Sequence, residues 1–378
     1  MRNLYNIGSQ YSDVLIVDEA GSEHIKRCIP RELSIKVLKL RNKMPYIYSF
    51  SFFICLIKRV LQFGVKKKSL FIAIVDSIDP RVIITFTDNS PIISIMSKVF
   101  PEKLVISIQN GIRIGPDLNF ASNFGNYSLP HYFGFGKYEH DLMVKNNIGF
   151  NNYYSSGSLK MDIFLSERYK AHTRRNDSRS VCLISEYSDS HASSNDKSWN
   201  EFGALQKELF SYVVLFCSNN NYELKVILRK NSTHSGYENE VNFFNSSKSL
   251  DRVTLYENNS DNLSAYIDSF ESSIIVALDS TLALELFSQG KKVLFCPAYK
   301  VRSLRNIEFR TYLSNLPEIN VLKELDISKF NKKFYNLLDM DNNEYSLYTK
   351  DARGDYMNYE QPYVHEIVSE FISRRLNV

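Results

Sequence analysis

Residues 276–297 read VALDSTLALELFSQGKKVLFCP, and the hydrophobic period changes twice within this stretch. A continuous apolar run ends at Asp279, apolar residues then recur at helical spacing, and a second run follows Gly290. A buried run, an amphipathic helix and another buried run in succession are the pattern of a β-α-β unit. The polar turn Asp-Ser-Thr therefore lies between the carboxyl end of a strand and the amino end of a helix.

The same alternation extends in both directions along the chain. In the first half, strand-like runs lie at residues 14–17, 70–75, 82–86, 104–108, 132–136 and 152–156. In the second half they lie at 181–185, 224–228, 253–256, 274–278 and 293–296, with helices at 200–218, 263–270 and 282–288. Strands that alternate with helices predict parallel sheets covered by helices. We therefore expect an α/β protein with two Rossmann-like domains whose sheets face a central cleft.

A polar and charged stretch, SERYKAHTRRNDSRS, interrupts this series at residues 166–180 and is predicted to be a linker. The linker divides the chain into an amino-terminal domain at residues 1–165 and a carboxyl-terminal domain at 181–360. The amphipathic segment 361–378 is expected to form a helix that packs back on the first domain. Ligands of open α/β folds bind at the carboxyl ends of the strands, so the functional residues are expected there.

Composition narrows the class of protein. The 378 residues are 44% hydrophobic, which is enough for cores of ordinary size, and the net charge of +4 gives no reason to expect nucleic acid as a partner. The five cysteines are scattered singly in apolar runs, without the paired spacing of a zinc or redox site. Because the amino terminus shows no hydrophobic signal segment, we expect a cytoplasmic protein.

One apolar run, PYIYSFSFFICLI at residues 45–57, is followed by a basic segment. The run is shorter than the roughly 20 apolar residues of a membrane-spanning helix. The basic residues after it are Lys58, Arg59, Lys66, Lys67 and Lys68. The segment is either a buried helix with a solvated basic end, which its length favours, or a helix that lies on the anionic inner face of a membrane.

The turn in the opening stretch has the chemistry of a phosphate site. At Ser280 and Thr281, two hydroxyls accompany the outward-pointing N–H groups of the helix that follows. Glu285 lies one helical turn further on, and its carboxylate could accept hydrogen bonds from ribose hydroxyls. The alternative is a plain helix cap, for which Asp, Ser and Thr are all favoured.

Three segments resemble a known class of proteins. Residues 256–297 are similar to the donor-binding segment of GT-B glycosyltransferases, especially bacterial surface-polysaccharide transferases, and more distantly to UDP-N-acetylglucosamine 2-epimerases. SIQNGIR at 107–113 and YFGFGKYEHDLMVKNNIGFNNYYSSGSLKMD at 132–162 resemble acceptor-domain segments of O-antigen biosynthesis proteins. The resemblance implies a GT-B fold with an acceptor-side first domain and a second domain that binds the nucleotide-sugar.

The resemblance also implies roles at the donor site. Ser280 and Thr281 would bind the donor phosphate, and Glu285 would bind the ribose. Arg229 and Lys230 end a predicted strand, where they would neutralise the phosphates and stabilise the departing nucleotide. The sequence offers no convincing Asp-x-Asp pair at a strand end, so we expect no metal and no other cofactor.

The first domain would supply the residues around the acceptor and the sugar. These predicted residues are Asn89, Asn110, Gly111, Arg113 and Lys160. Gly111 allows a close approach to a ligand, and Asn110 and Arg113 can orient hydroxyls or an anion. Related polyol-phosphate transferases have a His-Gly pair here, and Asn110 replaces that histidine. Lys160 lies in GSLKMD, which is similar to a turn that closes the first domain in these families. Lys160 would therefore either contact an acidic donor or acceptor or have a structural role between the domains.

Transfer requires a base, because the acceptor hydroxyl loses its proton as it attacks. Asp88 is the first candidate by its place at a strand end, and Glu186 is the second. Either could instead be the nucleophile of a retaining enzyme, and Asp88 could also be a helix cap.

The leading hypothesis is a glycosyltransferase that moves a sugar from a CMP-, UDP- or GDP-linked donor to an O-antigen or capsule glycan. The acceptor would be a glycan or a lipid-linked precursor at the cytoplasmic face of the inner membrane. The alternatives are an enzyme like UDP-N-acetylglucosamine 2-epimerase and a non-catalytic subunit of a polysaccharide assembly complex.

Overall fold

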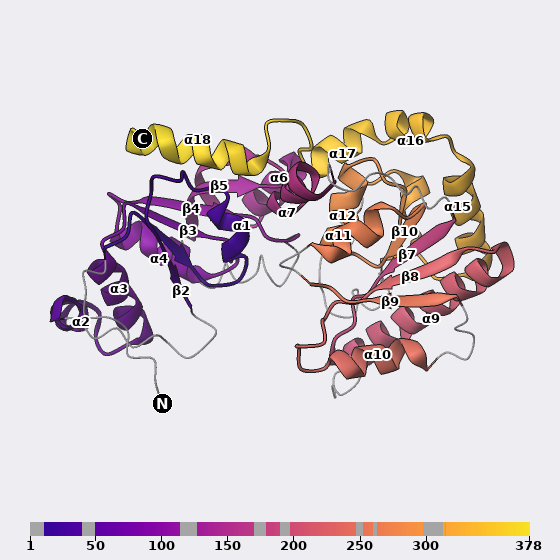
Figure 1. The fold of residues 1–378 in the computed structure, drawn as a ribbon, viewed down its shortest axis with the longest axis horizontal. Coiled ribbons are helices and arrows are strands. Elements are labelled where there is room, and N and C mark those ends of the chain that lie inside the picture. The colour runs from indigo at the N-terminus through magenta and orange to yellow at the C-terminus, as the bar shows by residue number, and fades with distance from the viewer. Residues whose placement is uncertain are drawn as a thin grey trace.

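Two parallel β-sheets organise the chain in the computed structural model (Figure 1), which describes residues 11–39, 50–113, 127–169, 179–189, 197–246, 252–259, 263–297, 313 and 315–378. The six-stranded sheet has the order β2-β1-β3-β4-β5-β6 and the five-stranded sheet the order β11-β10-β7-β8-β9. We call the parts built on these sheets the first and second domains. Every strand pair is parallel, which confirms the predicted α/β class.

The strands are short and mostly buried. In the first domain they are β1 (Val14–Val17), β2 (Ile35–Leu38), β3 (Val82–Thr85), β4 (Leu104–Ile108), β5 (Ser128–Gly134) and β6 (Gly149–Ser155). In the second domain they are β7 (Ser180–Ile184), β8 (Glu223–Ile227), β9 (Val253–Tyr256), β10 (Ile274–Ala277) and β11 (Val293–Phe295). Continuous apolar runs produce such strands because helices cover both faces of a parallel sheet.

Helices alternate with the strands along the chain. Those of the first domain are α1 (Ser22–Lys26), α2 (Phe50–Phe63), α3 (Lys67–Ile78), α4 (Pro91–Val99), α6 (Lys137–Lys145), α7 (Leu159–Ile163) and the π-helical segment η1 (Phe164–Tyr169). The second domain contains α9 (Lys197–Asn220), α10 (Tyr237–Asn245), α11 (Ser264–Phe270), α12 (Thr281–Ser288) and the 3₁₀ segment η2 (Glu318–Asn320). The chain then continues through α15 (Ile327–Asp339), α16 (Asn342–Tyr348), α17 (Lys350–Tyr356) and α18 (Val364–Leu376).

Alternating residues of the first sheet pack into two separate cores. Val14 and Ile16 of β1 belong to the core that contains α7 and α18 and continues into the second domain. Leu15 and Val17 belong to the core formed with α3 and α4. The alternation arises because successive side chains of a strand point to opposite faces.

The predicted strand at residues 70–75 is wrong, because this segment is the middle of α3. The run LFIAIV is buried almost all round, and a short buried helix and a buried strand share the same apolar pattern. β2 was not predicted. It is an edge strand with Lys36 in its middle and only Leu38 fully buried, so its apolar pattern is weak.

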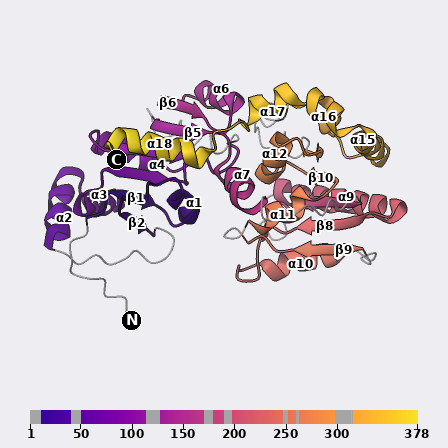
Figure 2. The ribbon, with the colours of Figure 1, turned by 45° about the horizontal axis from the view of Figure 1, so that its top comes forward.

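The carboxyl-terminal helix α18 lies along the first domain (Figure 2). Its Phe371 ring packs 5.0 Å from the ring of His131 and 5.6 Å from that of Phe133, between centroids. Arg81 Nη2 donates a hydrogen bond to the carbonyl oxygen of Leu376 at 2.9 Å. The chain thus crosses between the domains a second time after α17.

The predicted linker at 166–180 lies mostly outside the described residues. Residues 166–169 continue η1, β7 begins at Ser180, and 170–178 are among those not described. The domain limits of the sequence analysis therefore stay predictions. Within the described chain, no helix has both the length and the apolar character needed to cross a membrane.

Candidate functional site

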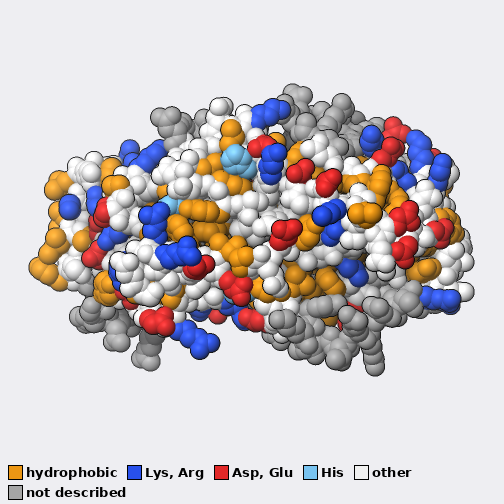
Figure 3. Space-filling view, turned by 90° about the horizontal axis from the view of Figure 1, so that it is seen from above, with side chains coloured by type: hydrophobic (Ala, Val, Ile, Leu, Met, Phe, Trp, Pro, Cys, Tyr) orange, Lys and Arg blue, Asp and Glu red, His pale blue; other side chains and the backbone are white. Residues whose placement is uncertain are grey.

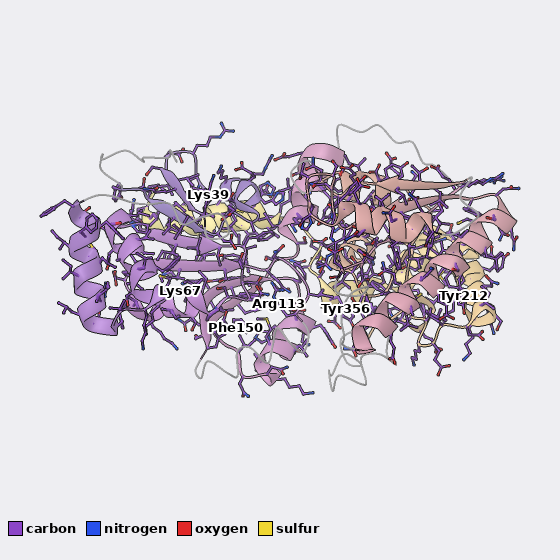
Figure 4. The ribbon with its side chains drawn as sticks, turned by 90° about the horizontal axis from the view of Figure 1, so that it is seen from below. Lys39, Lys67, Arg113, Phe150, Tyr212 and Tyr356 are labelled. Carbon is purple, nitrogen blue, oxygen red and sulfur yellow. The ribbon has the colours of Figure 1, made fainter. Side chains whose placement is uncertain are left out.

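The carboxyl ends of β4 and β10 meet where the two domains touch, and we call this contact the seam. Ile112 N donates to Thr281 Oγ1 at 3.2 Å, which joins the loop after β4 to the start of α12. A Cβ atom at Gly111 would lie 3.2 Å from the same oxygen, so glycine permits this close approach. Figure 4 shows the neighbouring Arg113 in the middle of the molecule, between the domains.

Glu285 of α12 forms the second contact of the seam. Its Oε1 accepts a hydrogen bond from Ser158 Oγ of the first domain, and its Oε2 accepts one from Tyr266 OH of α11 at 2.7 Å. The residue is only 1% exposed, and burial raises the pKa of its carboxyl, while the Lys160 charge and the two hydroxyls oppose that rise. A ribose that bound Glu285 would therefore have to replace at least one of these hydroxyls.

Lys160 brings a positive charge to the same place. Its Nζ donates to Asn110 Oδ1 at 3.0 Å and lies 5.4 Å from the centre of the Phe86 ring. Burial lowers the pKa of Lys160, and the nearby carboxylate of Glu285 opposes that shift. The structure thus brings together five of the predicted residues, from both domains: Asn110, Gly111, Lys160, Thr281 and Glu285.

Asp88 and Arg113 form a buried ion pair on the first-domain side. Arg113 Nε donates to Asp88 Oδ2 at 2.8 Å and Nη2 donates to Oδ1, while Tyr132 OH donates to Oδ2 at 2.6 Å. Arg113 N donates in turn to Glu139 Oε1 at 2.7 Å. Asp88 is 2% exposed, and its two oxygens already accept these hydrogen bonds, whereas the next residue, Asn89, is exposed.

Glu186 follows β7 and supports the turn before α12. Its Oε1 accepts a hydrogen bond from Asp279 N at 2.7 Å, and the residue is half-buried. Because β7 neighbours β10 in the sheet, Glu186 lies in the second domain beside the turn that precedes α12. Its hydrogen bond fixes where the backbone of the turn lies.

Arg229 and Lys230 are adjacent in the chain but lie in different surroundings. Glu240 accepts from both backbone N–H groups, at 2.8 and 3.1 Å, which holds the end of β8 in place. Lys230 is buried, and its Nζ donates to Asp189 Oδ2 at 2.5 Å. Arg229 is exposed at the same edge of the sheet. β8 lies two strands from β10, which separates the strand ends by roughly 10 Å.

Ser280 precedes the first residue of α12, at the capping position. Its backbone is extended, as capping requires, but its side chain makes no capping hydrogen bond, and the residue is half-buried. Thr281 Oγ1 accepts from the first domain. Ser280 therefore occupies the start of a helix without capping its N–H groups, a position suited to an anion.

Asp341, in the Asp-x-Asp sequence at residues 339–341, has a structural role. Asp341 caps α16, because its Oδ1 accepts from Asn343 N at 2.8 Å. In the part of the chain that the structure describes, no group of three His, Cys, Asp or Glu side chains could hold a metal ion.

Sequence reasoning missed the partners of the predicted residues. Ser158 lies two positions before Lys160 in GSLKMD and caps α7, accepting from Met161 N at 3.3 Å. A serine before a short amphipathic segment is a capping signal, but it does not indicate a contact across domains. Tyr132 and Tyr266 lie inside apolar segments, where the sequence carries no sign that their hydroxyls meet carboxylates.

Comparison with known structures identifies the class of this architecture. The UDP-GlcNAc 2-epimerase from Neisseria meningitidis, bound to UDP-GlcNAc, is 14% identical, with a TM-score of 0.53 over 96% of this chain and 99% of that one. The S. aureus MnaA–UDP co-structure gives 12% identity and a TM-score of 0.55 over 96% of both chains. The wall teichoic acid polymerase TagF, soaked with CDPG, gives 10% and 0.52 over 98% and 90%. The protein has the GT-B fold, as the resemblance implied.

The particular family follows from the sequence itself. Residues 106–361, about two thirds of the chain, match the model of a family described as "putative O-antigen biosynthesis protein". The chain belongs to this family, which confirms the predicted resemblance to surface-polysaccharide proteins. No curated protein matches it.

Proposed function

We propose that the protein is a metal-independent glycosyltransferase that moves a sugar from a CMP-, UDP- or GDP-linked donor to a surface-glycan acceptor. The observation that carries this proposal is the start of α12, where Ser280 occupies the capping position but its side chain makes no capping hydrogen bond. Membership of the O-antigen family supports the glycan context. The UDP-GlcNAc, UDP and CDPG named for the structural neighbours support a nucleotide-linked donor.

The donor phosphates would lie between α12 and the end of β8. The helix start and Ser280 would donate hydrogen bonds at one end of the diphosphate or monophosphate. Arg229 would provide a cation at the other, where negative charge builds on the departing nucleotide. Lys230, held by Asp189, would contribute its charge from below the surface. Lys160 and Asn110 would face the sugar from the first domain.

The two predicted bases differ in how their carboxylates are held. Both carboxylate oxygens of Asp88 accept hydrogen bonds from Arg113, and one accepts a further bond from Tyr132, so neither is available to take a proton from the glycan acceptor. We therefore assign it to positioning Arg113 and the loop after β4. Glu186 is half-buried at the strand end next to the donor turn, so we prefer Glu186 as the general base.

An epimerase is the second candidate, supported by the match to UDP-GlcNAc 2-epimerases over almost the whole chain. Such an enzyme needs carboxylates that exchange protons on both sides of the sugar. In the described part of the first domain, Asp18, Asp88 and Glu139 lie near strand ends and are buried and hydrogen-bonded, while Glu19, after β1, is half-buried. The burial of three of these four carboxylates favours transfer over epimerisation.

A thermal-shift screen with CMP, CDP, UDP, GDP and their sugar conjugates tests the donor site. A nucleotide at about 100 times its Kd should stabilise the wild-type protein by about 2.7 kcal/mol. Arg229→Gln should lose most of that gain, because a charge-assisted hydrogen bond contributes about 1.5 to 3 kcal/mol. Arg252→Gln is the matched control, since Arg252 is an exposed arginine just before β9, at the opposite end of the same sheet.

The product then separates the alternatives. A transferase releases nucleotide from the bound sugar conjugate only when a glycan acceptor is added, whereas an epimerase converts the conjugate without one. Binding with neither reaction would favour a non-catalytic subunit. If no nucleotide shifts the melting temperature, the proposed donor site is wrong.

A further inference from the structure

α2 exposes an apolar stripe on the first domain. Its residues Phe50, Phe53, Ile54, Ile57 and Leu61 are 46–84% exposed. Their spacing of three and four residues places them on one side of the helix. Val65, in the turn to α3, is 91% exposed and adds an apolar side chain just beyond the end of the helix. Figure 3 shows hydrophobic side chains gathered at the same end of the molecule.

The opposite side of α2 is firmly packed. Phe52 is buried in the core formed with α3 and α4, and Phe63 packs against that core. Arg59 Nε and Nη2 donate to the two carboxylate oxygens of Asp76 on α3, at 2.5 and 2.8 Å. The exposed stripe is therefore the second apolar side of a helix that is already anchored by its first.

The charges beside the stripe all have one sign. The chain contains no Asp or Glu from residue 50 to residue 75. Lys58, Lys66, Lys67 and Lys68 are exposed within this segment. Lysines flanking an apolar helix face are complementary to a surface that combines acyl chains with anionic headgroups.

We propose that the outer side of α2, with Val65 and these four lysines, docks on an anionic lipid bilayer. A second copy of the chain fits less well, because two such faces in contact would bring lysines against lysines. α2 lies at the end of the first domain remote from the second domain (Figures 1 and 2), so docking leaves the seam uncovered. The proposal deepens the proposed function, on which its role of presenting a lipid-linked acceptor rests.

Co-sedimentation of the full chain with vesicles tests the docking surface. We expect binding to vesicles of phosphatidylcholine with 30% phosphatidylglycerol and little binding to phosphatidylcholine alone. Phe53→Ser/Ile57→Ser/Leu61→Ser should abolish binding, since it removes the inserted side chains. Lys58→Gln/Lys66→Gln/Lys67→Gln should weaken it about a hundredfold, at about fivefold for each lysine near the surface. Raising the salt to 1 M should weaken wild-type binding too.

The matched control changes three exposed lysines of the second domain, Lys323→Gln/Lys332→Gln/Lys350→Gln, and should bind as the wild type does. Circular dichroism and an unchanged nucleotide shift verify that each variant folds and keeps its donor site. Failure to bind anionic vesicles overturns the docking proposal and leaves the donor site untouched. The proposal is also overturned if the protein does not bind vesicles but forms a concentration-dependent dimer that the serine variant abolishes. The partner of α2 would then be a second copy of the chain.

Discussion

Polar residues on the two sides of the seam occupy equivalent places at the ends of parallel strands, but they differ in burial and in hydrogen bonding. On the first-domain side, Asp88 and Arg113 are buried and satisfy each other. On the second-domain side, Arg229 is exposed and Ser280 makes no capping hydrogen bond. Position at a strand end therefore does not by itself mark a binding group. What separates Asp88 and Arg113 from Arg229 and Ser280 is whether the protein's own groups already meet the hydrogen-bonding needs of each side chain.

The strongest test of this comparison is removal of the Asp88 carboxylate. Asp88→Ala should lower the free energy of unfolding by about 3 to 5 kcal/mol, because it leaves the buried guanidinium of Arg113 without its anion. Urea unfolding measures the change. The control is Glu370→Ala on α18, whose pair with Arg374 is exposed and should contribute less than about 1 kcal/mol.

Asp88→Asn addresses the competing role of this residue. If Asp88 positions Arg113, the amide should weaken the pair and lower stability, with activity falling in step. An Asp88→Asn protein as stable as the wild type but without turnover would instead identify Asp88 as the base. That result would make the two sides of the seam alike.

A smaller effect should come from Asp162 on α7, where the first domain receives α18. Burial raises the pKa of this carboxyl from 3.8 to about 7, helped by Glu366 and Glu285 and opposed by the hydrogen bond from Val364 N. A raised pKa favours folding below about pH 3.8, and that contribution is lost as the pH rises through about 7. A shift of this size corresponds to about 4 kcal/mol at most.

The measurement is the stability difference between wild type and Asp162→Asn from pH 4 to pH 8. The asparagine keeps an oxygen for Val364 N but does not titrate, so the wild type should lose stability relative to it as the pH rises. Asp326→Asn is the control, since hydrogen bonds from Ser328 Oγ and Lys329 N lower the pKa of Asp326 below its usual 3.8. The contribution of Asp326 is therefore nearly complete above pH 4, and its difference from wild type should stay almost constant over this range. Parallel pH profiles for wild type and Asp162→Asn would show that the first domain does not hold this carboxyl neutral.

Much of the fold could be predicted because, in most elements, the hydrophobic period of the sequence matches the pattern of buried side chains in the structure. β4 and β9 have the predicted limits, since each is an apolar run bounded by polar residues. The failure at α3 has a physical cause, because a helix buried on nearly all sides loses the polar stripe that identifies it. The edge strand β2 was missed for the converse reason, because too few of its side chains are buried to give an apolar run.

The site was less accessible to sequence reasoning. The turn at Ser280 and the glutamate one helical turn beyond Thr281 are local patterns, and a single stretch of sequence contains them. The contacts of Glu285 with Ser158 and of Asp88 with Arg113 join residues 127 and 25 positions apart. Such partners decide whether a charge is available to a ligand, and no local pattern specifies them.

The smallest expected effect, and the sharpest test of the proposed donor site, is the stability of Ser280→Ala. A capping serine contributes about 1 kcal/mol, so a serine without a capping bond should cost less than about 0.5 kcal/mol when removed. Ser90→Ala is the matched control, because Ser90 caps α4 and accepts from Ile92 N at 3.4 Å. Thermal unfolding of both variants measures the difference.

The same two variants should respond in the opposite order to a nucleotide. Ser280→Ala should weaken nucleotide binding about fivefold to tenfold, the effect of one lost hydrogen bond, while Ser90→Ala should leave it unchanged. Equal losses of stability with no change in binding would make Ser280 an ordinary cap. The hydrogen-bonding needs at Ser280 would then be met by the protein itself, as they are at Asp88. Of the two second-domain residues compared, only Arg229 would still differ from the Asp88–Arg113 pair. If removing the Ser280 hydroxyl lowers the stability of the fold little but weakens nucleotide binding severalfold, the hydroxyl serves the ligand and not the fold.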